Sequence, residues 1–284
     1  MPSLLSFASL LLSKSNLQAE RLDFHQWRME SLKGLEQFLP RPLQSPRVSA
    51  WLPRNKTAVN LLSAAAHIKS SYGTRYGHLS VPEQKLFYVR IPKAASTSIA
   101  FELLTKIKPA LKTESLNPTQ INFLADAWLN TTLSHDAHHF TGFTIVRHPV
   151  SRLFSVYRDF FQRDAGKPFI YQNYLGGILP QTLSFDEFVE RISRIPNRFK
   201  DQHFKPQHLF IKPYRKKGIS IQVFKLEEPE KLQQFLLPYN IALPHLNKSP
   251  ETTPIPYRES TLDTIKKMYA FDFKVYEYDH NLGW

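Results

Sequence analysis

Two segments of the chain share one pattern, in which a run of β-forming residues ends in a basic, proline-containing loop and helix-forming residues follow. The first run covers residues 86–91 and stops at Pro92. The second run covers residues 140–146 and leads to Pro149, which suits the first turn of a helix. Strands that alternate with helices predict an α/β fold with a central, mostly parallel β-sheet flanked by helices.

Further elements extend this alternation toward the C-terminus. Ser184 and Glu187 have the spacing of a capping box at the start of a helix. Residues 219–224 form another predicted strand, and Pro229 lies in the first turn of the predicted helix that follows. The strand-and-helix organisation therefore continues well beyond the two loops.

The N-terminal residues have a different character. Residues 14–38 place apolar side chains on roughly one helical face, prolines then break the chain, and residues 57–69 form a second short helix. A loop is expected from there to residue 84. We therefore divide the chain into an N-terminal helical accessory region, residues 1–80, and a main domain, residues 81–284.

The opening apolar run, residues 3–12, is expected to be an ordinary helix rather than a targeting signal. No basic residue precedes it, and Lys14 ends it well short of the ~18 residues that a membrane span needs. The chain also has no cysteine. Disulfides, thiolate metal ligands and a cysteine nucleophile are therefore excluded.

The charge of the chain points to an anionic partner. Lys and Arg number 37 against 24 Asp and Glu, which gives a formal net charge of +13. Such a balance favours nucleic acid, an acidic membrane surface, an acidic sugar or a multiply charged nucleotide. Charge alone does not choose among them.

The first loop places a lysine and three hydroxyl groups at the predicted start of a helix. Lys93 is followed by Ser96, Thr97 and Ser98, and Ser96 or Thr97 is expected to cap a helix that extends to about residue 107. Free N–H groups and the helix dipole favour an anion there. The glycines of a triphosphate loop are absent, which disfavours an ATPase or kinase. A capped helix with a solvated lysine is the plainer interpretation and stays open.

The second loop places an arginine where the predicted strand ends. The guanidinium group of Arg147 can bind a phosphate through two hydrogen bonds. Ser155 lies on the helix that leaves this loop, on the same face as Ser151. The plainer alternative is that Arg152 and Arg158 are surface charges paired with carboxylates.

The two loops together resemble those of the PAPS-dependent carbohydrate sulfotransferases (sulfotransferase family 2), the group that contains the HNK-1, chondroitin and dermatan enzymes. The likeness rests on Pro-Lys-Ala-Ala-Ser-Thr-Ser at residues 92–98 and on Val-Arg-His-Pro-Val-Ser-Arg-Leu-Phe-Ser at residues 146–155. Residues 202–207 look like a further segment of the family. The similarity extends over about residues 85–280.

The resemblance implies a P-loop-like three-layer fold with PAPS as the sulfuryl donor and no metal. It also implies that Arg147 and Ser155 bind the 3′-phosphate of the donor, while the first loop binds its 5′-phosphosulfate. Lys93 would stabilise charge on the oxygen between phosphorus and sulfur. The expected donor-binding residues of the first loop are Pro92, Lys93, Ala94, Ala95, Ser96, Thr97 and Ser98.

An acceptor hydroxyl needs a general base, and histidine suits this role near neutral pH. His138 and His139 lie between the two loops, where the related heparan 2-O-sulfotransferase also places its base. His203 competes with them because it falls in the family-like segment, and Glu102 is a third candidate. Each histidine could equally be a hydrogen-bonded packing residue, and no acidic pattern beside the histidines indicates a metal site.

We therefore expect a sulfotransferase that transfers the sulfuryl group of PAPS to a hydroxyl of an acceptor, most readily a carbohydrate or glycan, and releases PAP. A non-catalytic basic module that binds acidic polysaccharide or nucleic acid is the alternative. Residues 212–217, interpreted as an acceptor-side or a plain solvated loop, are the one stretch that mixes basic and aromatic residues in the way such a module needs.

The same resemblance sets expectations for partners and location. No nucleic-acid partner is expected, and contact with a membrane surface stays open. Members of the family in the Golgi usually have a membrane anchor and paired cysteines. The absence of both predicts a cytoplasmic, bacterial-type member rather than one of the Golgi lumen.

Overall fold

The computed structural model describes most of the main domain expected from the sequence. The predicted helices at residues 14–38 and 57–69 and the opening apolar run lie outside the described residues. The described ranges are residues 77–113, 115–129, 138–162, 169–171, 174–242 and 255–279.

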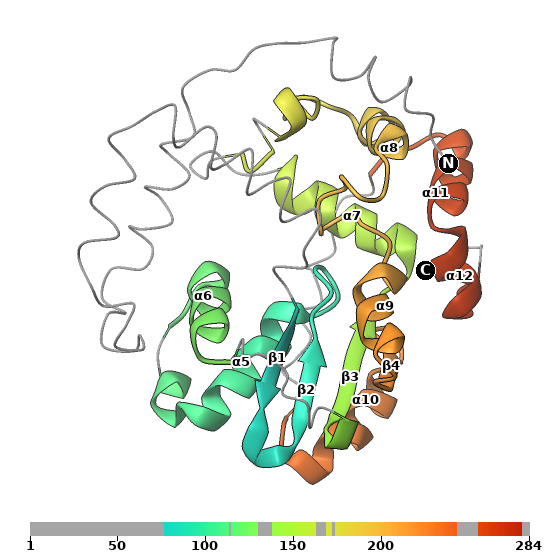
Figure 1. Ribbon diagram of the computed structural model, residues 1–284. Helices are drawn as coiled ribbons and strands as arrows, with labels where there is room; N and C mark the ends of the chain where they lie inside the picture. The colour runs from blue at the N-terminus through green and yellow to red at the C-terminus, as the bar shows by residue number, and fades with distance from the viewer. Residues whose placement is uncertain are drawn as a thin grey trace.

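A four-stranded sheet lies at the centre of these residues (Figure 1). Its strands, side by side in this order, are β1 (His78–Val81), β2 (Leu86–Val89), β3 (Thr141–Val146) and β4 (Ile221–Lys225). β1 pairs with β2 in antiparallel fashion, whereas β2, β3 and β4 run parallel to one another. The predicted α/β fold with a mostly parallel sheet is confirmed.

β1 occupies a segment for which the sequence predicts a loop. It has four residues and reaches β2 through one 3₁₀ turn, Pro82–Gln84, after which Lys85 adopts a left-handed conformation with φ of 48°. A strand this short shows no clear alternation in sequence, and its pairing with β2 stabilises it. The sheet therefore begins inside the stretch that the sequence assigned to the accessory region.

The helices begin largely where their sequence signals predict. The capping box of Ser184 and Glu187 is present at the start of its helix. The segment that contains residues 212–217 is helical rather than a loop, even though Pro213 lies inside it. The helices are α5 (Ser96–Ile107), α6 (Pro118–Leu129), α7 (Pro149–Phe160), α8 (Phe185–Arg194), α9 (His208–Lys216), α10 (Pro229–Leu236), α11 (Glu259–Met268) and α12 (Ala270–Val275).

Helices cover both faces of the sheet, which makes three layers. On one face the ring of Tyr214, from α9, stacks on Phe87 of β2 at a centroid distance of 5.9 Å. On the other face Phe235, from α10, packs against Phe143 of β3 at 5.2 Å. Phe87 lies so close to β3 that a Cβ at Gly142 would come within 2.3 Å of its ring, so this position requires glycine.

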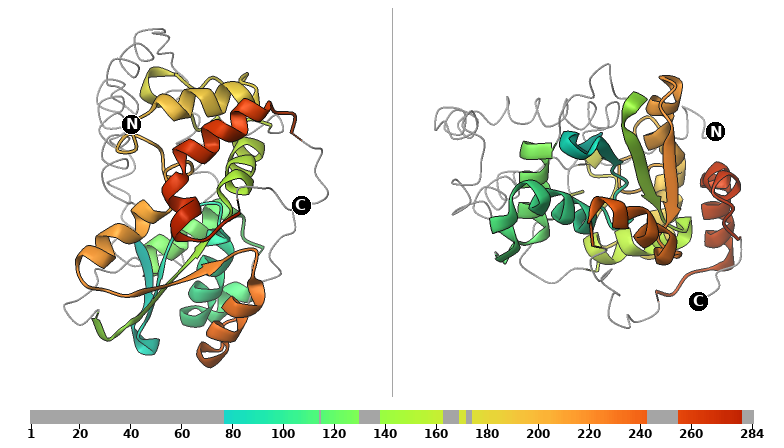
Figure 2. Two further views of the ribbon diagram at one scale, coloured as in Figure 1. Left: turned by 90° about the vertical axis from the view of Figure 1, so that its right-hand side faces the viewer. Right: turned by 90° about the horizontal axis from the view of Figure 1, so that it is seen from below.

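The buried apolar side chains form two clusters. The first surrounds the sheet and includes side chains from α5, α6, α9 and α10. The second joins α7, α8, α11 and α12. Figures 1 and 2 show α7, α8 and α11 beyond the end of the sheet at which β3 leads into α7. The loops that follow β2 and β3 therefore lie where the two clusters meet, at the edge where ligands bind in sheets of this kind.

Candidate functional site

The loop after β2 has a strained backbone. Lys93 and Ala95 adopt left-handed conformations, with φ of 67° and 55°, and α5 begins directly after Ala95. Non-glycine residues in this region cost about 1–3 kcal/mol each, and they persist where the surroundings enforce them, often at ligand sites. Tight turns of this kind make successive backbone N–H groups converge on one point, which forms a binding site for an anion.

The hydroxyl residues at the start of α5 do not cap the helix. The sequence predicts Ser96 or Thr97 as the cap, but Ala95 holds this position, and its side chain makes no capping hydrogen bond. Thr97 Oγ1 instead accepts a hydrogen bond of 3.3 Å from Asn122 Nδ2. The positive end of the α5 dipole thus coincides with the strained turn, and both favour an anion.

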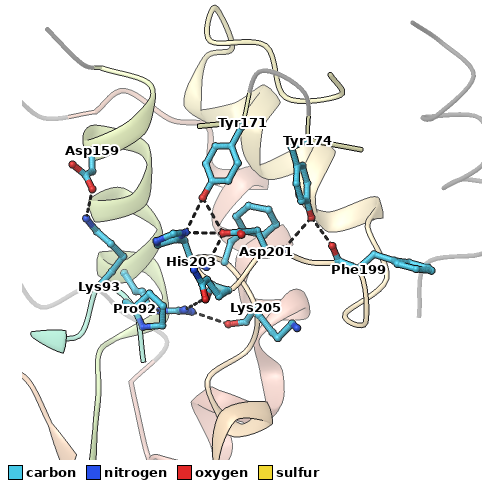
Figure 3. Close-up of polar contacts among 12 residues, drawn as sticks. Pro92, Lys93, Asp159, Tyr171, Tyr174, Phe199, Asp201, His203 and Lys205 are labelled. Atoms are coloured by element: carbon cyan, nitrogen blue, oxygen red, sulfur yellow. Dashed lines mark hydrogen bonds and ion pairs between the residues drawn. The ribbon is translucent and has the colours of Figure 1, made fainter. Parts of the chain in front are cut away.

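Lys93 contacts two residues of α7, and Figure 3 shows its bond to one of them, Asp159. Its Nζ donates a hydrogen bond of 2.8 Å to Oδ2 of Asp159 and lies 5.5 Å from the centre of the Phe160 ring. The Lys93 side chain is 19% exposed, whereas that of Asp159 is 48% exposed. Burial lowers the pKa of Lys93 below its usual value, and the Asp159 carboxylate opposes this change. Asp159 therefore acts as the counter-ion of the lysine expected to bind the donor.

Arg152 joins the first loop to a distant segment of the chain. Its side chain is buried, and its guanidinium group donates three hydrogen bonds to backbone carbonyls. One reaches Pro92 at 2.9 Å, and the others reach Gln202 and Lys205 at 2.8 Å each. Pro92 and Lys205 are labelled in Figure 3. The interpretation of Arg152 as a surface charge is wrong. Its role is to hold the lysine loop against residues 202–205.

Arg147 follows β3 and contacts the first loop directly. Its Nη1 donates to the carbonyl of Lys93 at 3.3 Å. Its backbone N–H and carbonyl both bond to the buried amide of Gln207, at 2.9 and 2.7 Å. Burial lowers the pKa of Arg147, while the Glu227 carboxylate opposes the change. The structure therefore brings the two predicted anion-binding loops together at one edge of the sheet.

The backbone of Gln207 is held in turn by the C-terminal part of the chain. Oδ2 of the buried Asp272, on α12, accepts the backbone N–H of Gln207 at 2.6 Å. Its Oδ1 accepts the backbone N–H of His208 at 3.0 Å and lies 2.6 Å from His208 Nδ1. This carboxylate caps the start of α9 and offers a physical reason why the segment is helical despite Pro213.

Ser155 lies on α7, the helix that leaves the Arg147 loop, and is partly exposed. Ser151 precedes it by one turn on the same helix. The structure thus places Ser155 on the element that also carries Asp159, the partner of Lys93.

His203 forms a second polar group beside Lys93. Its Nδ1 lies 2.7 Å from Oδ1 of Asp201, and its backbone N–H donates to the same oxygen at 3.0 Å. The Tyr171 hydroxyl also donates to this oxygen at 3.1 Å. Figure 3 shows His203 with Asp201 and Tyr171. The His203 ring packs edge-on against Phe160 at 4.8 Å, and Phe160 is the residue over which Lys93 lies. The lysine and the histidine therefore both contact the ring of Phe160.

The carboxylate of Asp201 stays ionised over the whole physiological range. Burial alone would raise its pKa, but the positive charge of His203 and hydrogen bonds from His203 and Tyr171 lower it to about 2. A carboxylate at Nδ1 favours the imidazole tautomer with its proton on Nδ1, which leaves Nε2 as the acceptor. The Asp201 carboxylate therefore fixes the orientation of the His203 ring.

The other candidate bases lie elsewhere. His138 and His139 are exposed and precede β3, whereas Arg147 follows it, so about six strand residues, ~20 Å, separate them. His138 is instead adjacent to Gly218, at the end of α9. Glu102, on α5, lies beside Lys106 and Lys112, and burial raises its pKa. Neither the histidine pair nor Glu102 joins the group around Lys93.

Several residues of this site carry weak sequence signals. Arg152 falls within the family-like segment at residues 146–155, and Asp201 precedes His203 by two residues, so both could have been proposed. Asp159 and Tyr171 meet partners that are far away in the sequence, so no local motif indicated them. Within the described ranges, no group of three or more His, Asp or Glu side chains has an arrangement that could hold a metal ion. No helix of this part of the chain is long and apolar enough to cross a membrane.

Comparison with known proteins identifies the family. The sequence model of the sulfotransferase family matches residues 78–279, which is more than half of the chain. The chain therefore belongs to the sulfotransferase family, and its matched region contains both loops, Arg152 and the His203 segment. No curated protein and no solved structure matched it.

Proposed function

We propose that this sulfotransferase takes its sulfuryl group from PAPS and transfers it to a hydroxyl of a carbohydrate acceptor, with PAP as the second product. One observation carries this proposal: Arg147 bonds to the carbonyl of Lys93, so the two basic loops form a single anion-binding surface with two cationic groups. A donor with phosphate groups on both the 3′ and the 5′ sides of one nucleoside suits such a surface. A nucleotide with phosphates on the 5′ side alone would use one of the two loops.

The first loop suits the 5′-phosphosulfate of the donor. The strained turn at Lys93 and Ala95 and the start of α5 supply backbone N–H groups. The residues assigned to this contact are Pro92, Lys93, Ala94, Ala95, Ser96, Thr97 and Ser98. Arg147 and Ser155 are assigned to the 3′-phosphate, for which a guanidinium group offers two parallel donors.

The transfer itself breaks the bond between sulfur and the 5′-phosphate oxygen and forms a bond between sulfur and the acceptor oxygen. Lys93 stabilises the negative charge that develops on the leaving phosphate oxygen. His203 accepts the proton of the acceptor hydroxyl at Nε2, while Asp201 stabilises the resulting imidazolium. As in phosphoryl transfer, position and charge supply most of the rate enhancement.

His203 is preferred over the other candidate bases because of its position. It shares the Phe160 ring with Lys93, and it has an ionised carboxylate at Nδ1. His138 and His139 lie at the opposite edge of the sheet, and Glu102 lies among lysines of α5 and the turn that follows it. We therefore assign the base to His203 alone.

The donor assignment can be tested by thermal stabilisation. PAP should raise the Tm clearly more than AMP or ATP, because only PAP has both a 3′- and a 5′-phosphate. Arg147→Ala should abolish this preference, while the bonds from its backbone to Gln207 remain. Arg198→Ala, an exposed arginine outside the site, serves as the control. Equal shifts with all three nucleotides would refute the assignment of the 3′-phosphate.

The acceptor assignment needs a turnover assay. Labelled PAPS should transfer its sulfuryl group to members of a panel of neutral and acidic oligosaccharides. A protein that binds PAP but transfers to none of these acceptors, nor to water, would favour the non-catalytic alternative.

A further inference from the structure

A second basic surface lies at the edge of the sheet opposite the donor loops. β2, β3 and β4 are parallel, so the residues that precede them meet at one edge, as the residues that follow them meet at the other. In the register of the sheet, Leu86 is level with Thr141, and Gly142 is level with Ile221. The segments before these strands are therefore neighbours, about 5 Å apart from strand to strand.

These segments carry a concentration of basic side chains. All are exposed, and they come from three separate elements: the turn before β2, the residues before β3, and the C-terminal half of α9 with the residue that follows it. We call them the amino-edge patch, which consists of Lys85, His138, His139, Lys212, Arg215, Lys216 and Lys217.

Two contacts join the elements of the patch. The backbone N–H of Thr141 donates to the carbonyl of Lys85 at 2.7 Å, which places the turn beside the start of β3. The ring of His138 lies 3.9 Å from the position that a Cβ would take at Gly218, directly after α9. The patch is therefore continuous from the turn before β2 to the end of α9.

The charge of the α9 part is not neutralised within the described residues. No Asp or Glu oxygen in these ranges lies within 4 Å of the side-chain nitrogens of Lys212, Arg215, Lys216 or Lys217. By contrast, Lys225 and Lys231 both pair with Glu228. Cations at a helix C-terminus are favoured by its dipole, but this accounts for cations in the last turn only and not for Lys85 or the histidines.

We propose that the amino-edge patch binds a linear acidic glycan, a chain with repeated carboxylate or sulfate groups, independently of the donor site. β3 separates the patch from the donor loops by ~20 Å. A single sugar could not occupy both sites, whereas a polymer could. Binding of the polymer at this patch would raise the local concentration of anionic chains near the enzyme.

The side chains of the patch favour a glycan over nucleic acid. Proteins that bind single strands combine basic grooves with exposed aromatic rings on which bases stack. Tyr214 is the aromatic residue within the basic run, but its ring is buried against Phe87 and its hydroxyl bonds to His78 at 2.9 Å. The patch therefore presents cations without a stacking surface.

A membrane is also a poorer partner. Stable attachment to a lipid surface needs apolar insertion in addition to basic charge. Among the exposed large apolar side chains, Leu237 is near this edge, because Tyr239 of the same turn accepts a hydrogen bond from Gln84 beside Lys85. Burying one leucine contributes at most about 3 kcal/mol, and this is too little for stable attachment.

The test compares two full-length variants that lose the same charge. The patch variant carries Lys212→Ala, Arg215→Ala, Lys216→Ala and Lys217→Ala. The control variant loses four cations from other surfaces, through Lys112→Ala, Lys266→Ala, Lys267→Ala and Lys274→Ala. Alanine is a good helix former, so both variants are expected to keep the fold. A heparin dodecasaccharide is the probe, and neutral dextran oligosaccharides are the uncharged control.

The patch variant should bind the dodecasaccharide at least tenfold more weakly than the parent, with a shallower dependence of log Kd on log salt. The control variant should stay within about twofold of the parent. His138→Ala, a single change on another element, should weaken binding in the same direction and serves if the fourfold variant does not fold. Equal losses in the patch and control variants would refute the inference, since net charge alone would then explain the binding.

Two further arms test the class of partner. Single-stranded RNA of the same charge and vesicles of phosphatidylserine and phosphatidylcholine should both bind more weakly than the oligosaccharide. Patch-dependent binding that is tighter to either of them would overturn the glycan assignment. The PAP-induced rise in Tm should be the same in parent and patch variant. A parent that binds the dodecasaccharide but not PAP would refute the proposed donor and leave this inference standing.

Discussion

Lys93 Nζ and Asp159 Oδ2 form a hydrogen-bonded ion pair of 2.8 Å, which joins the loop after β2 to the last turn of α7. The lysine assigned to the donor phosphosulfate therefore has a protein carboxylate as its partner. A polyanionic donor must separate this pair before Lys93 can bind it. Asp159 is thus expected to oppose donor binding.

Asp159→Asn should therefore tighten PAP binding. The carboxylate is half-exposed and partly screened by water, so its removal should contribute about 0.5–1 kcal/mol, which corresponds to a two- to fivefold lower Kd. Isothermal titration with PAP measures this change. Asp263→Asn, an exposed carboxylate on α11, is the matched control and should leave the Kd unchanged. Weaker PAP binding by Asp159→Asn would contradict a competing role for this residue.

Burial lowers the pKa of Lys93, and this gives the donor site a dependence on pH. In the free protein, Lys93 should lose its proton at a lower pH than an exposed lysine, whose pKa is 10.5. PAP affinity should therefore decline with rising pH in a range that begins below 10.5. Lys93→Arg should remove this decline, because a guanidinium group stays charged throughout.

The pH series for Lys93 needs a matched control. Lys267→Arg, on α11, should show the same decline as the parent. A parent whose PAP affinity is constant up to pH 10.5 would show that Lys93 does not contact the ligand as a charged group.

His203→Ala should lower the rate of sulfuryl transfer without a loss of PAP affinity. General base catalysis contributes typically 10²–10⁴-fold, so a loss in this range is expected in single-turnover experiments. Added imidazole should restore part of the rate. Asp201→Asn should also lower the rate, since the histidine loses the carboxylate that orients it.

The same assay shows which of the three histidines acts as the base. His138→Ala and His139→Ala should transfer at the parental rate, because both residues lie beyond the far end of β3. A severe loss in either of these variants, with His203→Ala close to the parent, would refute the assignment of the base.

Much of the strand-and-helix order could be predicted from local signals. Pro149, Pro229 and the Ser184–Glu187 capping box each act within one helical turn, and each marks the start of a helix in the structure. The sequence did not predict β1 and α9, because both depend on contacts with residues outside the element itself. β1 is stabilised by its pairing with β2, and α9 begins on a carboxylate from α12, some 65 residues away in the chain.

The site shows the same division between local and distant information. The motifs correctly placed Lys93 and Arg147 at the ends of two neighbouring strands, because parallel strands bring their carboxyl ends to one edge. The partners of these residues could not be predicted in this way. Asp159 and Arg152 lie on the same helix and contact the first loop in different ways. Asp159 forms an ion pair with Lys93, whereas Arg152 donates a hydrogen bond to the carbonyl of Pro92.

Lys200 is a buried amine whose Nζ donates a hydrogen bond of 3.0 Å to Oδ1 of Asn197. Burial lowers its pKa to about 7. Between pH 7 and 10.5 the unfolded chain therefore binds a proton that the folded chain does not hold. The free energy of unfolding should rise with pH across this window, by up to about 1.4 kcal/mol per pH unit from this group.

Lys200→Met should remove this dependence, because a thioether of similar length fills the same space without a proton to lose. The variant should be more stable than the parent at pH 7, by at least about 1 kcal/mol, and its advantage should shrink as the pH approaches 10. Urea unfolding at pH 7 and pH 9.5 measures both values. For Lys212→Met, on the exposed face of α9, the difference in stability from the parent should be the same at both pH values. An advantage of Lys200→Met that is constant with pH would show that Lys200 keeps its charge in the folded protein.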